Sequence, residues 1–362
     1  MHVSPKTIEV KPRLQWIDAA KGIGIIIVIL IHSEIWNCCK SDDSHSFTYL
    51  ARFIGTAAIP IMPLFYILSG YTFKNQPSVM RQRLKRLMSP YILWGCVALS
   101  IWAITSAKTA DCSDFLLRTA GLIYSRYSFL PPEGASTIRL FPNGAEPLWF
   151  LTSMVSSYAC FLVLIRFFQY RKLVIISYII MTVLLSFLPV LLPWSLDTAP
   201  AGALFLYAGY MMKEQKIFQR PTSWLLLSAI ILLPLLAVLI KYNGSINMSI
   251  RQYGKHPFLS PCLFLFIGII GSYLYCLLCI TLEKLKIAHT LTYIGRISLT
   301  ILCSHMLVLS CTGRVVGKIA YTLNIPPPSG QYLFIWQLII ALLFAIILTE
   351  VCRLGRSLLQ RR

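Results

Sequence analysis

Residues 16–33 read WIDAAKGIGIIIVILIHS, and they place Asp18, Lys21 and His32 within or beside a long apolar run. In a helix that turns about 100° per residue, Lys21 and His32 lie within about 20° of each other around the axis. Asp18 lies about 40° from His32 and three residues before Lys21. The same geometry places His32 about 16 Å deeper than Lys21, or roughly half of a hydrocarbon core. The stretch therefore predicts a membrane helix with an acid, a cation and an imidazole on one face.

A structural interpretation of these residues stays open. Asp18 and Lys21 can be ordinary residues at the mouth of a span, with the ammonium of Lys21 extending to the interface. His32 can be a packing residue. It follows an almost unbroken apolar run, however, and ionisable groups at such depth are costly and usually functional. We therefore expect His32 to be a functional residue.

The composition excludes a soluble domain. Of the 362 residues, 57% are hydrophobic and 13% are charged. A soluble fold could not bury so much apolar surface, so the chain is predicted to be a polytopic membrane protein. The net charge of +20 comes from short basic clusters between apolar runs. This arrangement is typical of membrane topology and differs from the continuous basic stripe of a nucleic-acid-binding protein.

The apolar segments predict an all-α bundle of about ten transmembrane helices in a single domain spanning residues 1–362. We expect a short basic N-terminus at 1–15, a tail at 351–362, no cleaved signal peptide, and both termini in the cytoplasm, because Lys and Arg are concentrated on that side. The expected spans are Trp16–Trp36, Phe53–Phe73, Leu87–Ala107, Leu148–Phe168, Leu173–Leu192, Ala199–Met212, Trp224–Ile240, Phe258–Leu282, Leu291–Ser310 and Tyr332–Glu350. The sixth is short and rich in Gly.

Two predicted outward loops are long. The loop Lys108–Glu146 contains turn signals and a stretch, Phe115–Tyr124, that is expected to form a short amphipathic helix at the interface. The other outward segment is Gly313–Gly330. Most cysteines lie within apolar segments and are interpreted as packing residues. A disulfide stays open among the three that are predicted to lie in outward loops, Cys38, Cys39 and Cys112.

A basic cluster precedes the third expected span, where residues 80–91 read MRQRLKRLMSPY. Arg83 and Arg86 are an i, i+3 pair on one helix face. Planar guanidinium groups on a shared face suit phosphate, because each can donate two parallel charge-assisted hydrogen bonds. A topological role in contact with anionic lipid is the alternative.

A second intramembrane imidazole lies in the ninth expected span. His305 is predicted to lie at a depth similar to that of His32, and Ser298, seven residues earlier, shares its helix face. Two histidines at one depth on different helices suggest a shared polar cavity. They are too few for a metal site, and we expect no metal.

Two further positions are candidates for substrate contact. Ser69 lies in YILSGY at residues 66–71, where a hydroxyl adjoins a glycine that permits close approach. Trp149 opens the fourth expected span, where tryptophan is also a routine interface anchor. Each of them is more often structural when it occurs alone.

Taken in order, these stretches resemble the acyltransferase 3 family of integral-membrane acyltransferases, and specifically the branch similar to fucose 4-O-acetylases. The resemblance runs from about Trp16 to Leu309. It is carried by five motifs: DAAKG at 18–22 through His32, LSGY at 68–71, Arg83-x-x-Arg86 followed by Pro90-Tyr91, PLWFL at 147–151, and Gly295-x-x-Ser298 through His305. Lys21 stands where many members have Arg. Many members also carry an acidic residue shortly after the tryptophan, and this chain has none after Trp149.

The resemblance implies a cytoplasmic acyl-CoA donor, acetyl-CoA by default, and a glycan or lipid-linked saccharide acceptor at the outer face of a bacterial inner membrane. It implies that His32 is the catalytic imidazole and that Arg83 and Arg86, together with Lys21, hold the coenzyme. A neutral imidazole can take the proton of the attacking hydroxyl. Asp18 is expected to pair with Lys21. The candidate donors to the oxyanion, which the sequence does not rank, are Ser69, Ser298 and a protonated His305.

Two other functions remain open at the level of sequence. A transporter or flippase for a glycan or lipid-linked intermediate also uses paired charges in a bundle core. An assembly or sensory membrane protein could use the same polar residues only to determine helix register. The concentration of His, Lys and Arg in three helices favours the enzyme.

Overall fold

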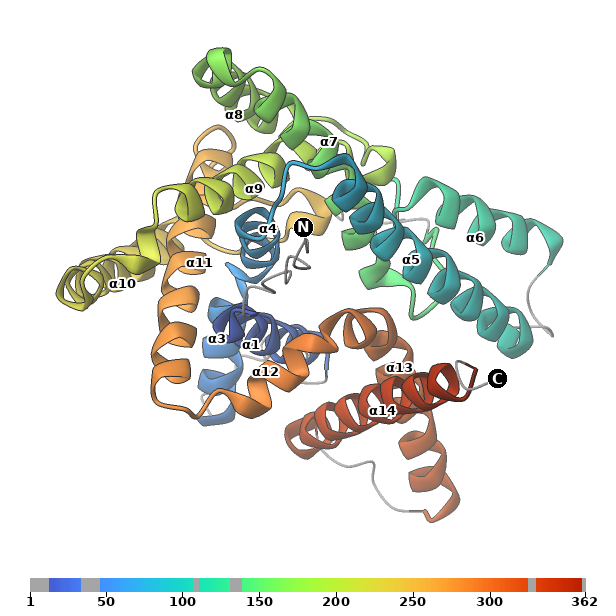
Figure 1. The fold of residues 1–362 in the computed structure, drawn as a ribbon. Helices are drawn as coiled ribbons and strands as arrows, with labels where there is room; N and C mark the ends of the chain where they lie inside the picture. The colour runs from blue at the N-terminus through green and yellow to red at the C-terminus, as the bar shows by residue number, and fades with distance from the viewer. Residues whose placement is uncertain (1–12, 34–45, 107–110, 131–138, 325–329, 360–362) are drawn as a thin grey trace, which may run out of the picture.

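The computed structural model describes residues 13–33, 46–106, 111–130, 139–324 and 330–359. They form a bundle of α-helices joined by short connections and 3-10 turns (Figure 1). The helices are α1 Gln15–His32, α3 Ser46–Ala58, α4 Ile61–Tyr71, α5 Pro77–Ser106, α6 Cys112–Tyr124, α7 Trp149–Arg166, α8 Arg171–Ser186, α9 Ala199–Glu214, α10 Thr222–Asn243, α11 Ser260–Lys284, α12 His289–Arg296, α13 Ser298–Thr322 and α14 Gly330–Leu359.

The predicted all-helical, polytopic architecture is confirmed. Nine helical segments of the described chain are long and apolar enough to cross a membrane. The sixth expected span corresponds to α9, whose 16 residues are fewer than such a crossing ordinarily requires. Because α9 is buried among other helices, protein side chains and not lipid surround most of it. We call the end of the bundle where α1 begins the inner end and the opposite end the outer end.

Four expected boundaries differ from those of the structure. The second span is broken at Pro60, which separates α3 from α4, and the ninth is broken at Ile297, which separates α12 from α13. A proline interrupts the helical ladder because it lacks an N–H and clashes with the preceding turn. The segment expected as a loop from Gly313 is helical as far as Thr322. The basic cluster at residues 80–86, expected before a span, already lies within the long helix α5.

The predicted amphipathic helix in the long outward loop exists as α6. The side chain of Asp111 caps its first turn by accepting a hydrogen bond from the backbone N–H of Asp114 at 2.8 Å, and the helix ends at Ser125 in the left-handed conformation. Cys112, at its start, is a free thiol. The other two cysteines considered for a disulfide, Cys38 and Cys39, lie outside the described residues.

Helix α1 lies in the middle of the bundle and packs directly on the backbone of α12 (Figure 1). A Cβ atom added to Gly295 would lie 1.7 Å from the carbonyl oxygen of Asp18, and one added to Gly22 would lie 2.1 Å from that of Leu291. No side chain fits in either place. These two glycines of the sequence motifs therefore allow two helices to touch backbone to backbone.

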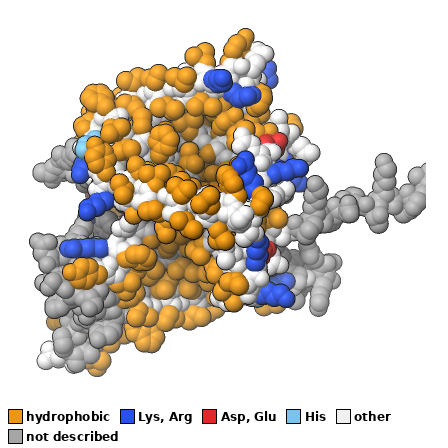
Figure 2. Space-filling model, turned by 90° about the vertical axis from the view of Figure 1, so that its left-hand side faces the viewer, with side chains coloured by type: hydrophobic (Ala, Val, Ile, Leu, Met, Phe, Trp, Pro, Cys, Tyr) orange, Lys and Arg blue, Asp and Glu red, His pale blue; other side chains and the backbone are white. Residues whose placement is uncertain are grey.

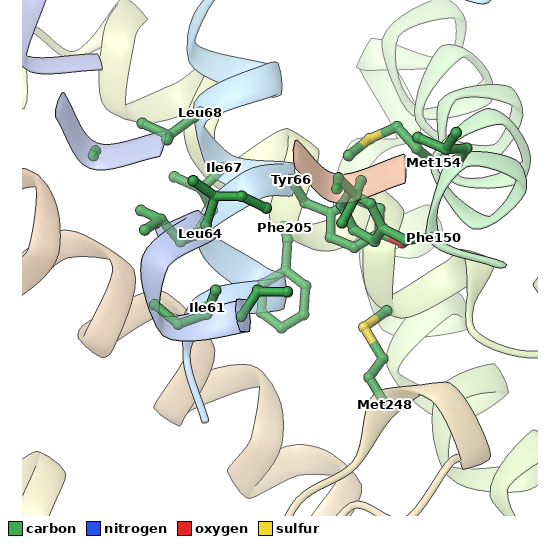
Figure 3. Close-up of a cluster of buried hydrophobic side chains, with 14 of the residues drawn as sticks. Ile61, Leu64, Tyr66, Ile67, Leu68, Phe150, Met154, Phe205 and Met248 are labelled. Atoms are coloured by element: carbon green, nitrogen blue, oxygen red, sulfur yellow. The ribbon is translucent and has the colours of Figure 1, made fainter. Parts of the chain in front are cut away.

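A second close contact joins α4 to α9. Cβ atoms added to Gly70 and Gly209 would lie 1.9 Å and 2.0 Å from the carbonyl oxygens of Leu206 and Ile67. Around this contact the two helices and α7 enclose a core of large apolar side chains, part of which Figure 3 shows: Ile61, Leu64, Tyr66, Ile67, Leu68, Phe150, Met154, Phe205 and Met248.

At the outer end, a buried ion network ties the connections together. Asp197 forms ion pairs with Arg126 and with Arg251, the latter at 2.8 Å, and all three side chains are buried. Arg251 also donates hydrogen bonds to the carbonyl oxygens of Leu188 and Val190 at 2.8 Å and 2.9 Å. Removing one partner from such a network would leave an uncompensated buried charge, which is strongly destabilising. The network therefore holds the outer connections in one arrangement.

The helices at the periphery present apolar side chains outward. Hydrophobic side chains cover most of the face seen in Figure 2, with Lys and Arg mainly towards its left and right edges. Helices α8 and α10 project from the bundle in Figure 1, and few of their side chains are buried. This surface is what a hydrocarbon environment requires of a membrane helix.

We expect Gly295→Ala to destabilise the protein. Inserting a methyl group into a filled space typically costs 1–3 kcal/mol, roughly, whereas the gain in helix propensity is about 1 kcal/mol. The matched control is Gly313→Ala on α13, where an added Cβ meets nothing within 4 Å. Thermal unfolding in detergent, followed by size-exclusion chromatography, should show a lower midpoint for Gly295→Ala only. Equal midpoints for the two variants would contradict the backbone contact.

Candidate functional site

The two predicted intramembrane histidines meet. His32, at the end of α1, and His305, within α13, have ring centroids 5.2 Å apart, and Nε2 of His305 lies 3.3 Å from Nδ1 of His32. His305 is fully buried, whereas His32 is exposed on its other side. The sequence-based expectation of two imidazoles at one depth is therefore confirmed.

The hydrogen-bond partners assign the tautomers of the neutral rings. Nδ1 of His32 lies 2.8 Å from the carbonyl oxygen of Val28, and Nδ1 of His305 lies 3.0 Å from the carbonyl oxygens of Ile301 and Leu302. A carbonyl oxygen only accepts, so each Nδ1 carries its proton. Nε2 of His305 is then the acceptor towards His32. This leaves Nε2 of His32 as a free basic nitrogen, without a partner among the described residues.

His32 lines a cavity of about 860 Å³ at the outer end. The walls come from α1, α3, the start of α4, the start of α7, the end of α10, the connection at residues 244–249, α11 and α13. Such a volume is typical of a small-molecule binding site. His305 is not among the lining residues, so His32 alone of the pair faces the cavity.

Trp149 and Phe150 form the wall that α7 contributes to this cavity. Pro147 precedes them in a 3-10 turn, Glu146–Leu148, and Glu146 fixes that turn by accepting a hydrogen bond from the backbone N–H of Gly144 at 2.8 Å. The connection at residues 244–249 is held by the buried ion network around Asp197, because Arg126 donates to the carbonyl oxygen of Ser249 at 2.7 Å. The cavity is therefore built between two fixed connections.

At the inner end, Asp18 is the centre of a cluster of cations. Its buried carboxylate accepts hydrogen bonds from Nε and Nη2 of Arg13 at 2.5 Å and 2.9 Å. Lys21 is farther away, with Nζ 3.9 Å from Oδ1, and Arg296 lies 3.8 Å from Oδ2. The hydrogen bonds that Arg13 donates to Asp18 hold the pKa of Arg13 above its ordinary value. The expected partner Lys21 is thus the weaker one, because Arg13 makes a bidentate contact.

The two arginines of the basic cluster differ in their contacts. Arg83 donates to the carbonyl oxygen of Ser69 at 3.0 Å, to the hydroxyl of Tyr158 at 2.7 Å, and to the carbonyl oxygen of Thr72. These bonds satisfy the end of α4 and attach it to α5 and α7. Arg86 is exposed and has no hydrogen-bond or ion-pair partner in the described chain. Both lie close enough to Lys21 to repel its ammonium group.

The sequence-predicted residues therefore form two groups. His32, His305 and Trp149 lie at the outer cavity. The others lie at the inner end or towards it, namely Asp18, Lys21, Arg83, Arg86, Ser69 and Ser298. Neither Ser69 nor Ser298 lines the cavity that His32 faces. The groups are joined by α1, along which Lys21 and His32 are about 16 Å apart.

Sequence reasoning missed several residues of both groups. Arg13 precedes the apolar run, and the cavity residues Arg52 of α3 and Lys241 of α10 belong to no motif. The spacing of Arg13 and Asp18, five residues apart at a helix start, was the one local signal. Arg52 and Lys241 meet at the cavity only because helices distant in sequence pack together there.

Comparison with known protein families gives a result that is consistent with this geometry. A family model described as an acyltransferase domain, of the acyltransferase 3 type, matches residues 14–352. No curated protein and no solved structure matches the chain. The matched region contains both groups of residues and the α1 helix between them. The chain therefore belongs to the acyltransferase 3 family and is a multi-pass membrane acyltransferase.

Proposed function

We propose that the protein is an O-acetyltransferase of a bacterial inner membrane that moves an acetyl group from cytoplasmic acetyl-CoA to a hydroxyl of a cell-surface or lipid-linked glycan. The observation that carries this proposal is the environment of His32. Its Nδ1 proton is held by Val28 and by His305, and its Nε2 is free at a cavity large enough for a saccharide.

In the proposed reaction, Nε2 of His32 accepts the proton of the acceptor hydroxyl as that oxygen attacks the thioester carbonyl carbon. The tetrahedral intermediate then expels the coenzyme A thiolate, which takes the proton from the imidazolium, and the acetyl ester and free coenzyme A are the products. General-base assistance of this kind contributes roughly 10²–10⁴ in rate. His305 is a positioning residue, because its Nε2 accepts a hydrogen bond from the Nδ1–H of His32 and it does not line the cavity.

Stabilisation of the oxyanion requires a donor inside the cavity. Ser69, Ser298 and His305 were the candidates from sequence, and none of them lines it. Trp149 does line it, and its indole N–H has no partner among the described residues. We propose that this N–H faces the developing negative charge.

The inner cluster supports the proposed donor site. Arg86 and Lys21 present cationic groups at the end of α1 opposite His32, and Arg86 is the arginine of the pair whose guanidinium is not already bonded to the protein. Charge-assisted hydrogen bonds to phosphate groups are the natural use of such a group. In the proposed complex the acetyl group stays on the coenzyme A thiol, and the pantetheine arm would extend along α1 from this cluster to His32.

We expect His32→Ala to abolish acetyl transfer, with a loss of at least about 10²-fold, because the imidazole that would accept the hydroxyl proton is removed. The measurement is transfer of labelled acetyl from acetyl-CoA to glycan in membranes that contain equal amounts of wild-type or variant protein. A variant that keeps wild-type transfer would refute the proposed function.

We expect Arg86→Ala to raise KM for acetyl-CoA by about tenfold with little change in kcat, since a charge-assisted hydrogen bond contributes roughly 1.5–3 kcal/mol. The control is Arg81→Ala, which removes the same charge from a different face of the same helix. Arg83→Ala should instead lower the unfolding midpoint, because it leaves the end of α4 unsatisfied. An unchanged KM in Arg86→Ala would indicate that the basic cluster at residues 80–86 serves only membrane topology.

We expect His305→Asn to lower kcat by about 10²-fold with unchanged KM for donor and acceptor, because a small misplacement of the base is sufficient for such a loss. The control is Ser304→Ala, which removes a buried hydroxyl from the same helix that bonds only to the carbonyl oxygen of Thr300, at 2.9 Å. Full kcat in His305→Asn would show that His32 needs no orienting partner.

A further inference from the structure

We propose that the acceptor is an anionic saccharide and that Arg52 and Lys241 bind its negative charge. This inference rests on the proposed function and specifies the chemistry of the outer cavity. The two cations belong to different helices, α3 and α10, and both line the cavity that His32 faces.

The charged residues described in the cavity lining are all cations. Arg52 and Lys241 are exposed, and neither forms an ion pair within the described chain. No Asp or Glu is among the described residues that line the cavity. Elsewhere in this protein cations gather around a carboxylate, as Arg13, Lys21 and Arg296 do around Asp18. Among its described residues, the lining of the outer cavity thus has two cations and no carboxylate.

The wall behind the cavity adds to the positive potential. Arg126 and Arg251 share the single carboxylate of Asp197, so the buried network retains one net positive charge. Burial lowers the pKa of Arg251, and the adjacent Asp197 opposes that shift. Arg126 bonds to the backbone of Ser249, which itself lines the cavity. Fixed charge near a concave surface concentrates counter-ions there, and an anionic substrate benefits in the same way.

Each cation also has a structural interpretation. Lys241 lies in the last turn of α10, where a cation interacts favourably with the helix dipole. Arg52 could contact lipid headgroups from α3. Neither interpretation explains why both residues line the same concave surface as His32. An anion bound in this cavity would be attracted by both cations at once.

The remaining lining suits a sugar ring. Trp149 and Phe150 supply flat apolar surfaces, and Asn247 and Ser249 supply polar groups. A pocket of aromatic walls with a few polar groups orients a polar ligand. An anionic group held between Arg52 and Lys241 would leave a hydroxyl of the same saccharide free to approach His32.

Two sources can supply the negative charge: the carboxylate of a sugar acid, or the phosphate that links a glycan to its lipid carrier. The first experiment compares cells that produce the wild-type protein with cells that produce His32→Ala. Mass spectrometry of polysaccharide and of solvent-extracted lipid-linked glycan identifies the unit whose acetyl ester depends on His32. Acetyl on a sugar acid of the polysaccharide indicates the first source, and acetyl on a phosphate-linked glycan the second.

The second experiment measures acetylation of that unit by the double variant Arg52→Gln/Lys241→Gln. We expect a loss of about fivefold or more, since each partly exposed pair contributes on the order of 1 kcal/mol. We also expect the wild-type rate to fall with added salt more steeply than the rate of the variant. The matched control is Arg314→Gln/Lys318→Gln, which removes one Arg and one Lys from the outer part of α13, away from the cavity lining. The control should keep wild-type acetylation.

The results separate the two proposals. A His32-dependent acetyl ester on a neutral saccharide without a phosphate link overturns the anionic acceptor and leaves the acetyltransferase intact. An equal loss in the cavity variant and in the control also overturns it. If no acetyl ester depends on His32, the proposed function itself fails. The variants Arg52→Lys and Lys241→Arg, which keep the charges, should restore acetylation and thereby exclude misfolding as the cause of a loss.

Discussion

The contact between the backbones of α1 and α12 is the constraint on which the arrangement of the bundle depends. Gly22 and Gly295 remove the side chains that would hold the two helices apart, and the carbonyl oxygen of Asp18 lies where a Cβ atom of residue 295 would be. Because Ile297 is the only residue between α12 and α13, this contact also determines where α13 begins. The same packing thus brings His305 to the level of His32 at the other end of α1.

The two ends of the molecule use charge differently. At the inner end, one buried carboxylate is surrounded by cations, and the free guanidinium of Arg86 lies beside this cluster. At the outer end, a buried carboxylate neutralises one of two arginines and holds the connections that frame the cavity. In both places the carboxylate organises cations without being available to a substrate. Catalysis in the proposed reaction then depends on an imidazole and on hydrogen-bond donors, because no acidic side chain is among the described residues that line the cavity.

Much of the fold was predictable from the sequence because hydrophobic length is a local property. Most of the spans, the helix around Phe115–Tyr124 and the similar depth of His32 and His305 follow from run length and helical periodicity. The break at Ile297 was missed, although Gly295, Arg296 and Ser298 around it are unusual within a continuous apolar span. The short helix α9 was weakly predicted as a span, because its apolar run is short. A helix enclosed by protein needs neither the full length of a membrane crossing nor uniform hydrophobicity.

The contacts of the site were less predictable than its members. Arg83 and Arg86 look equivalent in sequence, and only the packing of α4 against α5 shows that the first is bonded to backbone carbonyl oxygens and the second is not. Arg52 and Lys241 carry no motif, since their shared surface is created by helices that are distant in the chain. Such partnerships depend on tertiary structure, which periodicity does not encode.

The double anchoring of the His32 ring has a rotational consequence. An imidazole that turns by 180° about its Cβ–Cγ bond exchanges the positions of nitrogen and carbon, and here such a turn would break the bond to Val28 and the contact with His305 at once. The ring is therefore confined to a single orientation. Its lone pair is aimed before any substrate arrives, and no part of the binding energy has to be used to reorient it.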